Sequence, residues 1–258
     1  MHWTINKRIN KKIILGSAQF GDRYGISKDK NIIKKREAKN ILKFSQKNNI
    51  ICLDTADRYK GSIKILHKQN LKKWKISLKI SSETISKLNT KKKFNNFFFK
   101  NLKKLNQKKF EYFLFHESQD LLTSKGKKVY EYLTILQKKG FINKIGVSAY
   151  SLNEMKKIIK NYKINVVQVP YNIFDQRLKE SNLINTLKNM NIELHVRSIF
   201  LQGLLLLKKN KIPKKFLKWQ DKFNLWYKFL KKNKTTALSE CLNFVFSNKD
   251  IDKIVIGI

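Results

Sequence analysis

Four residues of the types that transfer protons to a carbonyl oxygen occur at the ends of three apolar segments. Asp54 and Tyr59 lie in and just after the segment that begins at Ile51, Lys79 ends the next segment, and His116 ends the third. A carboxylate, a phenol, an ammonium and an imidazole can together donate a proton to a carbonyl oxygen and orient the carbonyl group. The four positions therefore predict an active site for the reduction of a carbonyl.

Short apolar strands that alternate with amphipathic helices are expected to position these side chains. We expect eight strands, at residues 13–17, 51–54, 74–79, 112–116, 142–148, 166–169, 193–197 and 253–257. We expect helices at residues 37–46, 62–68, 92–105, 125–139, 152–160, 178–190 and, in two pieces, 216–246. Most of the strands are nearly continuous apolar runs, which is typical of buried parallel strands. The pattern predicts an α/β protein with a (β/α)8 TIM barrel, formed by residues 1–258 as a single domain.

In such a barrel the carboxyl ends of the strands meet at one mouth, so Asp54, Lys79 and His116 should share a site with Tyr59. Tyr59 is the predicted general acid. A free phenol has a pKa near 10, and we expect the ammonium of Lys79 to lower that pKa. Asp54 would hold Lys79 through a charge-assisted hydrogen bond, and His116 would hydrogen-bond the carbonyl oxygen of the substrate.

The start of the chain and its two cysteines indicate the cellular compartment of the protein. Residues 1–12 are short and polar, and we expect a hairpin that plugs the bottom of the barrel. They contain no apolar signal segment, and no apolar run in the chain approaches the roughly 18 residues that span a bilayer. Cys52 and Cys241 are expected to be buried and reduced. These features predict a cytoplasmic protein.

The composition is strongly basic, with a formal net charge of +39 and a pI near 10.2. Such a charge could indicate a polyanionic partner. However, only six of the 57 basic residues are arginine, the residue favoured for contacts with phosphates and bases. The lysines are spread over nearly every predicted helix, and the chain is rich in Asn, Ile and Phe, which A/T-rich codons also encode. Genome composition can therefore explain the lysines without a nucleic-acid ligand.

The chain resembles the aldo/keto reductase family over residues 13–257. The resemblance rests on the four residues above and on motifs in chain order: Leu15-Gly16-Ser17-Ala18-Gln19-Phe20-Gly21, Asp54-Thr55-Ala56, Gly146-Val147-Ser148, Gln168-Val169-Pro170-Tyr171-Asn172, Asp175-Gln176-Arg177-Leu178 and His195-Val196-Arg197-Ser198-Ile199-Phe200-Leu201-Gln202-Gly203. The last three motifs resemble a bacterial branch that is often associated with surface-polysaccharide genes. The resemblance implies a barrel enzyme that reduces an aldehyde, a ketone or a sugar carbonyl.

The resemblance also implies a nicotinamide cofactor, NADP with NAD as a possible alternative, whose ring supplies the hydride that no side chain can donate. It implies that Ser148 and Gln168 contact the carboxamide of the nicotinamide, and that Arg197 and Ser198 lie beside the nicotinamide and pyrophosphate. Gly16 would permit a close backbone turn at the mouth. No Gly-x-Gly-x-x-Gly follows a strand, so a Rossmann site is not indicated, and no Cys/His spacing suggests a metal site.

The sequence departs from the family pattern in three places. Ala149 stands where many members have Asn, which removes one expected carboxamide contact, and Ile63 stands where an acidic residue is usual. The sequence also stops directly after the eighth predicted strand, where the family continues into a segment that binds the adenosine 2'-phosphate and then a closing helix. If the natural chain ends there, we expect weaker NADP binding and an exposed flank of the barrel.

Three other functions remain open from the sequence. One uses the same four residues for a sugar-linked dehydrogenation or isomerisation in polysaccharide assembly. A second is a catalytically idle barrel that serves as a binding or regulatory subunit. The third is a basic surface adapter for nucleic acid or an anionic membrane, for which residues 208–234 offer lysines interleaved with large apolar side chains; apolar residues three and four apart more often form the core face of a helix. His2 and His67 are expected to be incidental surface residues, and His195 a hydrogen-bonded residue of the barrel. The sequence gives neither the substrate nor the oligomeric state.

Overall fold

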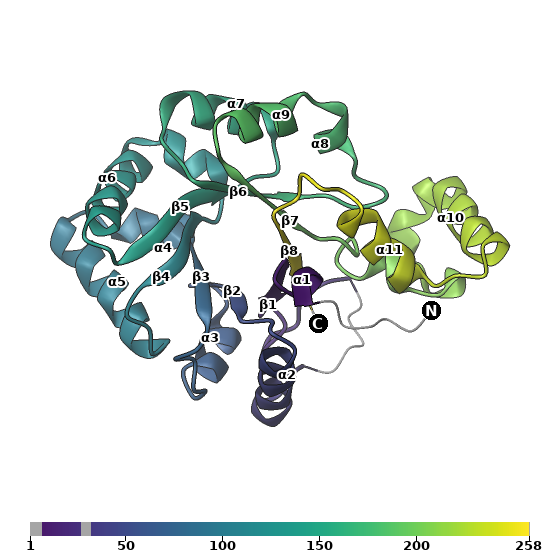
Figure 1. The fold of residues 1–258 in the computed structure, drawn as a ribbon, viewed down its shortest axis with the longest axis horizontal. Coiled ribbons are helices and arrows are strands. Elements are labelled where there is room, and N and C mark those ends of the chain that lie inside the picture. Colours follow the sequence, from purple (N-terminus) through teal and green to yellow (C-terminus); the bar gives the residue numbers. More distant parts are fainter. Residues whose placement is uncertain (1–6, 27–31, 258) are drawn as a thin grey trace.

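The computed structural model describes residues 7–26 and 32–257, which form a closed barrel of eight parallel strands (Figure 1). The strands follow chain order around the barrel: β1 (Ile13–Gly16), β2 (Cys52–Ala56), β3 (Lys75–Ile80), β4 (Phe110–Phe115), β5 (Ile142–Ser148), β6 (Val166–Pro170), β7 (Glu193–Arg197) and β8 (Lys253–Ile256). The predicted (β/α)8 TIM barrel is confirmed. Each predicted strand is present, with ends that differ by at most two residues, because buried parallel strands show in the sequence as continuous apolar runs.

Helices cover the outside of the barrel. They are α1 (Lys7–Asn10), α2 (Lys35–Lys47), α3 (Lys60–Leu66), α4 (Ser82–Lys87), α5 (Lys91–Lys104), α6 (Ser124–Lys138), α7 (Leu152–Asn161), α8 (Arg177–Glu180), α9 (Leu183–Asn189), α10 (Gln220–Lys232) and α11 (Ala237–Phe246), with 3-10 turns η1 (Ser118–Leu122), η2 (Leu204–Leu206), η3 (Lys209–Lys211) and η4 (Lys214–Trp219). Several helices begin at a side-chain cap: the hydroxyls of Thr90, Thr123 and Thr236 accept the backbone N–H three residues on. Such caps satisfy a donor that the helix itself leaves unpaired.

The helix predicted at residues 178–190 is two helices, because the chain is extended at Ser181 between α8 and α9. Helix α4 was not predicted from its apolar pattern. It is a short helix that begins at the hydroxyl of Ser81, which accepts the backbone N–H of Thr84. A side-chain cap thus marks the start of α4, whereas the start of α9 has no side-chain cap and is marked by the extended backbone at Ser181.

The described residues of the segment predicted to form an N-terminal hairpin do not form one. Residues 7–10 make a single helical turn, α1, and residues 1–6 lie outside the described part of the chain. The turn is held against the rest of the barrel, because Asn10 Nδ2 donates to Asn48 O at 2.8 Å and Lys12 Nζ donates to Ile251 O at 2.8 Å.

The strand register determines which side chains face the barrel interior. Gly16 pairs with Asp54, Ala56 with Lys79, and Ser148 with Gln168. Because successive side chains of a strand point to opposite faces, positions two apart line the interior. One buried cluster consists of such positions: Ile14, Cys52, Tyr112, Leu114, Val166 and Val255. Both cysteines are buried and free, as predicted, and burial raises the pKa of each thiol to about 12.

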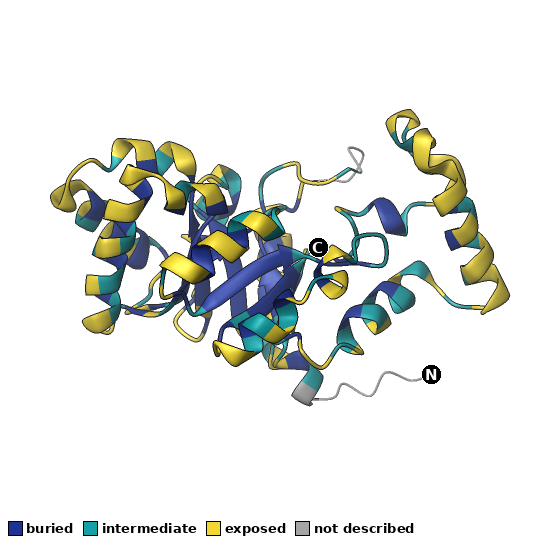
Figure 2. Cartoon of the chain, turned by 90° about the horizontal axis from the view of Figure 1, so that it is seen from above, coloured by how far each residue is buried: buried dark blue, intermediate teal, exposed yellow. Residues whose placement is uncertain are grey.

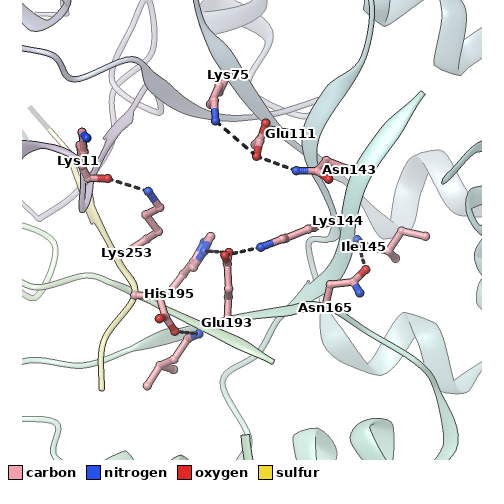
Figure 3. A network of polar contacts seen from close by, with 12 residues as sticks. Lys11, Lys75, Glu111, Asn143, Lys144, Ile145, Asn165, Glu193, His195 and Lys253 are labelled. Carbon is pink, nitrogen blue, oxygen red and sulfur yellow. Dashed lines mark hydrogen bonds and ion pairs between the residues drawn. The ribbon is translucent and has the colours of Figure 1, made fainter. Parts of the chain in front are cut away.

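The amino-terminal end of the barrel holds a polar network around Glu193 (Figure 3). Lys144 Nζ pairs with one carboxylate oxygen of Glu193, and Nε2 of His195 lies 3.2 Å from the other. The ring of Tyr112 meets that of His195 edge to face at 4.7 Å. His195 is thus a buried, hydrogen-bonded residue of the barrel, as predicted.

The segment between β7 and α11 extends away from the barrel, and α10 lies at its far end in both views (Figures 1 and 2). Phe223 and Trp226 of α10 are buried, so the prediction of a core face on this helix holds for those two residues. Among the described residues, no helix is long and apolar enough to cross a membrane.

Candidate active site

A buried ion pair joins the carboxyl ends of β2 and β3. Lys79 Nζ donates to Asp54 Oδ2, and the two side chains are 4% and 5% exposed. The second carboxylate oxygen, Oδ1, accepts from Ser77 Oγ at 3.0 Å and from Gln168 Nε2 at 3.2 Å, while Gln168 Oε1 lies 3.4 Å from Lys79 Nζ. Burial of an ion pair is costly unless its remaining hydrogen-bonding capacity is used. Ser77 and Gln168 meet that requirement and fix the ammonium in place.

Tyr59 lies next to this ion pair. It is in the first turn after β2 and directly precedes α3. The centre of its ring is 5.9 Å from Lys79 Nζ and 5.6 Å from the centre of the His116 ring, which it meets nearly at a right angle. A second phenol ring, of Tyr24, lies 6.4 Å away. The structure thus brings the four predicted catalytic residues together.

The prediction that Lys79 lowers the pKa of Tyr59 is wrong for this site. Burial, followed by the negative charge of Asp54, raises the pKa of the phenol above its ordinary value. The physical reason is that Asp54 balances the charge of Lys79, so the phenol is next to an ion pair and not next to a lone cation. Tyr59 therefore keeps its proton through the neutral pH range.

The His116 imidazole is neutral. Burial, and then the charges of Lys79, Arg58 and Arg197, lower its pKa to about 2. Its Nδ1 atom is buried and has no hydrogen-bond partner among the described residues. The other ring nitrogen, Nε2, is the one that could hydrogen-bond a carbonyl group beside the Tyr59 phenol.

Two contacts that the sequence did not predict hold the loop that carries Tyr59. The carboxylate of Asp57 accepts the backbone N–H of Ser81, just after β3, at 3.1 and 3.2 Å. Arg58 Nη1 lies 2.6 Å from Glu117 Oε1, in the residue that follows His116. These contacts tie the Tyr59 loop to the ends of both neighbouring strands. The sequence offered one clue to these contacts, because each of the four residues lies one or two positions from a predicted catalytic residue.

Arg197 and Ser148 meet on the opposite side of the mouth. Arg197 Nε donates to Ser148 Oγ at 3.2 Å, Nη2 lies 3.4 Å from Ala149 O, and the guanidinium lies 4.0 Å from the centre of the Tyr150 ring. Ser198 begins a loop with a left-handed backbone, with φ of 56° at Ser198 and of 49° and 57° at Leu201 and Gln202. Such backbone is uncommon outside glycine and often marks a functional loop.

A cavity of about 460 Å³ opens at this end of the barrel. The predicted residues that line it are Gly16, Asp54, Tyr59, Lys79, Gln168, Arg197 and Ser198. The cavity lining does not include His116 or Ser148, which contact lining residues, His116 through the Tyr59 ring and Ser148 through the Arg197 guanidinium. A Cβ atom at Gly16 would lie 3.2 Å from Ile256 O and 3.3 Å from Val255 Cγ1, so glycine keeps that wall of the cavity close-packed without a side chain.

This donor set fits a nicotinamide cofactor. The mouth offers a cationic guanidinium, hydroxyl groups and a side-chain amide beside a protonated phenol, whereas the described residues contain no group of three His, Cys, Asp or Glu that could hold a metal ion. A carboxamide needs both a donor and an acceptor from its surroundings, and Gln168 with Ser148 can supply both.

Comparison with known proteins identifies a family and a fold. The model of the aldo/keto reductase family matches residues 12–258. Similar solved structures include an aldo-keto reductase from Bacillus halodurans in its holo form, with a TM-score of 0.75, 16% sequence identity and coverage of 96% of this chain and 82% of that one. They also include the glycerol dehydrogenase of Gluconobacter oxydans, with a TM-score of 0.67, 15% identity and coverage of 96% and 82%. At these identities the solved structures show the fold alone. No curated protein gives a significant match.

Proposed function

We propose that this chain, which belongs to the aldo/keto reductase family, is an NAD(P)H-dependent oxidoreductase that reduces an aldehyde, a ketone or a sugar carbonyl. The observation that carries the proposal is that Asp54, Tyr59 and Lys79 line one cavity, with the neutral imidazole of His116 against the Tyr59 ring. Donation of a proton from Tyr59 to a carbonyl oxygen requires a protonated phenol, and a neutral imidazole can hydrogen-bond that oxygen.

In the proposed reaction, His116 hydrogen-bonds the carbonyl oxygen and orients it toward the Tyr59 hydroxyl. Tyr59 gives its proton to that oxygen as the oxygen gains electron density. The charges of Arg58 and Arg197 favour the phenolate that remains, whereas burial and the charge of Asp54 oppose it. Asp54 acts through Lys79, which it holds in position. Burial and the charge of Asp54 favour the return of a proton to Tyr59 before the next turnover.

The cofactor when bound supplies the hydride that reduces the carbonyl carbon. Gln168 and Ser148 would hold its carboxamide, Arg197 and Ser198 would lie beside its negatively charged part, and Gly16 would leave room for close approach. We expect NADP, with NAD as an alternative. Binding of the cofactor would compete with two hydrogen bonds within the protein, from Gln168 to Asp54 and from Arg197 to Ser148.

Two broader proposals accompany this function. The use of a nicotinamide cofactor and the two buried free thiols favour the cytoplasm as the place of action. The motifs that end at Gly203 suggest a carbonyl substrate from the assembly of surface polysaccharides.

Binding of NADPH and of NADH to the purified chain, followed through the tryptophan fluorescence, tests the proposal first. Trp74, Trp219 and Trp226 are present in the described residues as reporters. We expect micromolar binding, little changed in Tyr59→Phe, followed by carbonyl reduction that this variant lacks. Absence of binding to a folded chain would overturn the proposal, and binding with no turnover of any carbonyl by either protein would favour the idle barrel.

A further inference from the structure

The helix that follows Tyr59 begins without a side-chain cap of its own. Tyr59 occupies the cap position of α3 but makes no side-chain cap hydrogen bond, and the first turn of α3 contains no acidic residue. Helices α4, α5, α6, α7 and α11 instead begin at a serine or threonine whose hydroxyl accepts a backbone N–H of the first turn. A helix leaves its first N–H groups unpaired, so α3 needs an acceptor from another segment of the chain.

Asp22, in the loop after β1, supplies that acceptor. Its Oδ2 atom accepts the backbone N–H of Gly61, in the first turn of α3, at 2.8 Å. A carboxylate near the first turn of a helix also interacts favourably with the helix dipole. Asp22 thus does for α3 what the hydroxyls of serine and threonine do for the other capped helices, although it lies 39 residues before Gly61 in the chain.

The loop of Asp22 and the start of α3 approach each other closely at two glycines. A Cβ atom on Gly61 would lie 2.6 Å from the carbonyl carbon and oxygen of Gly21 and 2.7 Å from Asp22 Oδ1. A Cβ atom on Gly21 would lie 3.0 Å from the carbonyl carbon and oxygen of Gly61, and the φ of 73° at Gly21 also favours glycine. The contact of Asp22 with α3 therefore depends on the absence of a side chain at both positions.

The loop that carries Asp22 is itself fixed on the body of the barrel. Phe20 is fully buried, and the backbone N–H of Gly21 donates to Ile33 O at 2.9 Å. The carboxylate of Asp22 is thus attached to an anchored segment, so its hydrogen bond can hold α3 in place.

A second contact joins the same loop to α3. Ser62 Oγ donates to Ser17 Oγ at 2.8 Å, Ser17 Oγ donates to Asp54 O at 2.9 Å, and both serines are fully buried. The Asp22 contact is nearer to Tyr59 along the chain than this pair of serines. Because Asp22 is partly exposed, it can be substituted without opening the buried pair.

We propose that Asp22 positions Tyr59 for proton transfer by capping α3 from the loop after β1. The inference rests on the proposed reductase function, because it concerns the placement of the proton donor. Arg58 and Asp57 hold the turn of Tyr59 toward β4 and β3, and Asp22 holds it from the side of β1. Proton transfer is sensitive to this placement, since a displacement on the order of 1 Å can cost about a hundredfold in rate.

Steady-state kinetics on the intact chain test the proposal. Asp22→Ala removes the acceptor, so it should lower kcat for carbonyl reduction about tenfold, with little change in KM and an unchanged affinity for NADPH. Asp22→Asn should restore most of kcat, because its side-chain oxygen can still accept the N–H of Gly61. In a Tyr59→Phe background, Asp22→Ala should lower kcat no further, because no phenol is left to misplace.

Asp252 offers a matched control at the amino end of the barrel. Its Oδ2 atom accepts the backbone N–H of Leu194 at 2.8 Å, and Asp252 is also partly exposed. Asp22→Ala and Asp252→Ala should both lower Tm by about 2 to 4 °C, but only Asp22→Ala should lower kcat. An equal loss of kcat in the two variants would overturn the proposal, because the loss would then follow stability. So would a tenfold loss that persists in the Tyr59→Phe background.

Amide hydrogen exchange separates this inference from the proposed function. In Asp22→Ala, exchange in residues 59–63 should be about tenfold faster, because the uncapped turn opens more often, and exchange in β4 should not change. Faster exchange in a chain that reduces no carbonyl would overturn the reductase function and still support the role of Asp22 in holding the turn of Tyr59. Unchanged exchange would overturn the inference, as would faster exchange in an active enzyme whose kcat is unchanged.

Discussion

The two ends of this barrel hold the same four types of residue in similar contacts. At the carboxyl end, Asp54 pairs with Lys79 beside Tyr59 and His116. At the amino end, Glu193 pairs with Lys144 beside His195 (Figure 3), and the ring of Tyr112 meets that of His195. A carboxylate, an ammonium, an imidazole and a phenol thus occur twice, although we assign chemistry to only one of the two sets.

Two features distinguish the sets. Asp54, Tyr59 and Lys79 of the carboxyl-end set line the cavity of about 460 Å³, and Tyr59 lies in a loop; Tyr112 lies within β4 and packs against the buried ring of His195. The charge patterns also differ. The Asp54–Lys79 pair is buried, whereas the Lys144 and Glu193 side chains are 31% and 25% exposed. We infer that residue types alone do not distinguish a reactive cluster from a structural one. The distinction depends on room for a substrate and on the placement of the phenol.

Substitution of the two tyrosines, Tyr59 and Tyr112, should give the largest difference in activity between the two sets. Tyr59→Phe should lower kcat for carbonyl reduction by about 10² to 10⁴-fold, because it removes the proton donor while its ring still fills the same space. Tyr112→Phe should leave kcat unchanged. Steady-state kinetics on a carbonyl substrate measure both, and an equal loss in the two variants would break the comparison.

The two ammonium groups should differ next. Lys79→Met leaves the Asp54 carboxylate buried without its partner, so we expect a loss of about 3 to 5 kcal/mol in the free energy of unfolding together with loss of activity. Lys144→Met removes a partner from a more exposed pair, and we expect a smaller loss, near 1 kcal/mol, with activity retained. Urea denaturation and the same kinetic assay measure these quantities. A Lys144→Met variant that is stable but inactive would show that the amino-end set takes part in the reaction.

A third contrast concerns the ion pairs next to each set. Arg58→Met breaks the contact with Glu117 that ties the loop of Tyr59 to the end of β4. We expect kcat to fall on the order of tenfold through misplacement of Tyr59, with a loss of stability below about 1 kcal/mol because Arg58 is half exposed. Glu117→Gln should have the same effect, and the double variant no more than either.

The matched control for that pair is Lys75→Met, which breaks the 3.8 Å contact with Glu111 at the amino end. It should change neither kcat nor KM. If the Arg58 variant raised only KM and left kcat as it was, a role in positioning Tyr59 would be excluded.

The sequence was sufficient to predict the fold and the carboxyl-end set, because both follow from spacing. Each of Asp54, Lys79 and His116 lies at or one residue past an end of an apolar run, and parallel strands bring such ends together. The same reasoning could not pair Arg58 with Glu117 or Asp57 with Ser81, since loop contacts between strands have no periodicity. It also could not give the direction of the Tyr59 pKa, which depends on how completely Asp54 balances Lys79 and how deeply the phenol is buried.

The smallest expected effects are those of pH. Burial, with the nearby cations, lowers the pKa of His116 from 6.5 to about 2, and burial also lowers that of His195. The unfolded chain therefore binds more protons than the folded chain below pH 6.5, and the free energy of unfolding should fall as the pH is lowered from 6.5 toward 2. Hydrogen bonds from His195 and Lys144 overcome the effect of burial and bring the pKa of Glu193 down to about 2, so Glu193 adds a second loss below pH 4.5.

Activity should respond to pH differently from stability. Because His116 stays neutral and Tyr59 stays protonated across the neutral range, the kcat for reduction should show no inflection near pH 6.5 and none below pH 10 from either residue. His116→Gln should flatten the fall in stability between pH 6.5 and 4.5 only in part, since His195 still contributes. An inflection in kcat near pH 6.5 that His116→Gln removes would mean that the imidazole reacts in its charged form, and that the two histidines differ in protonation as well as in place.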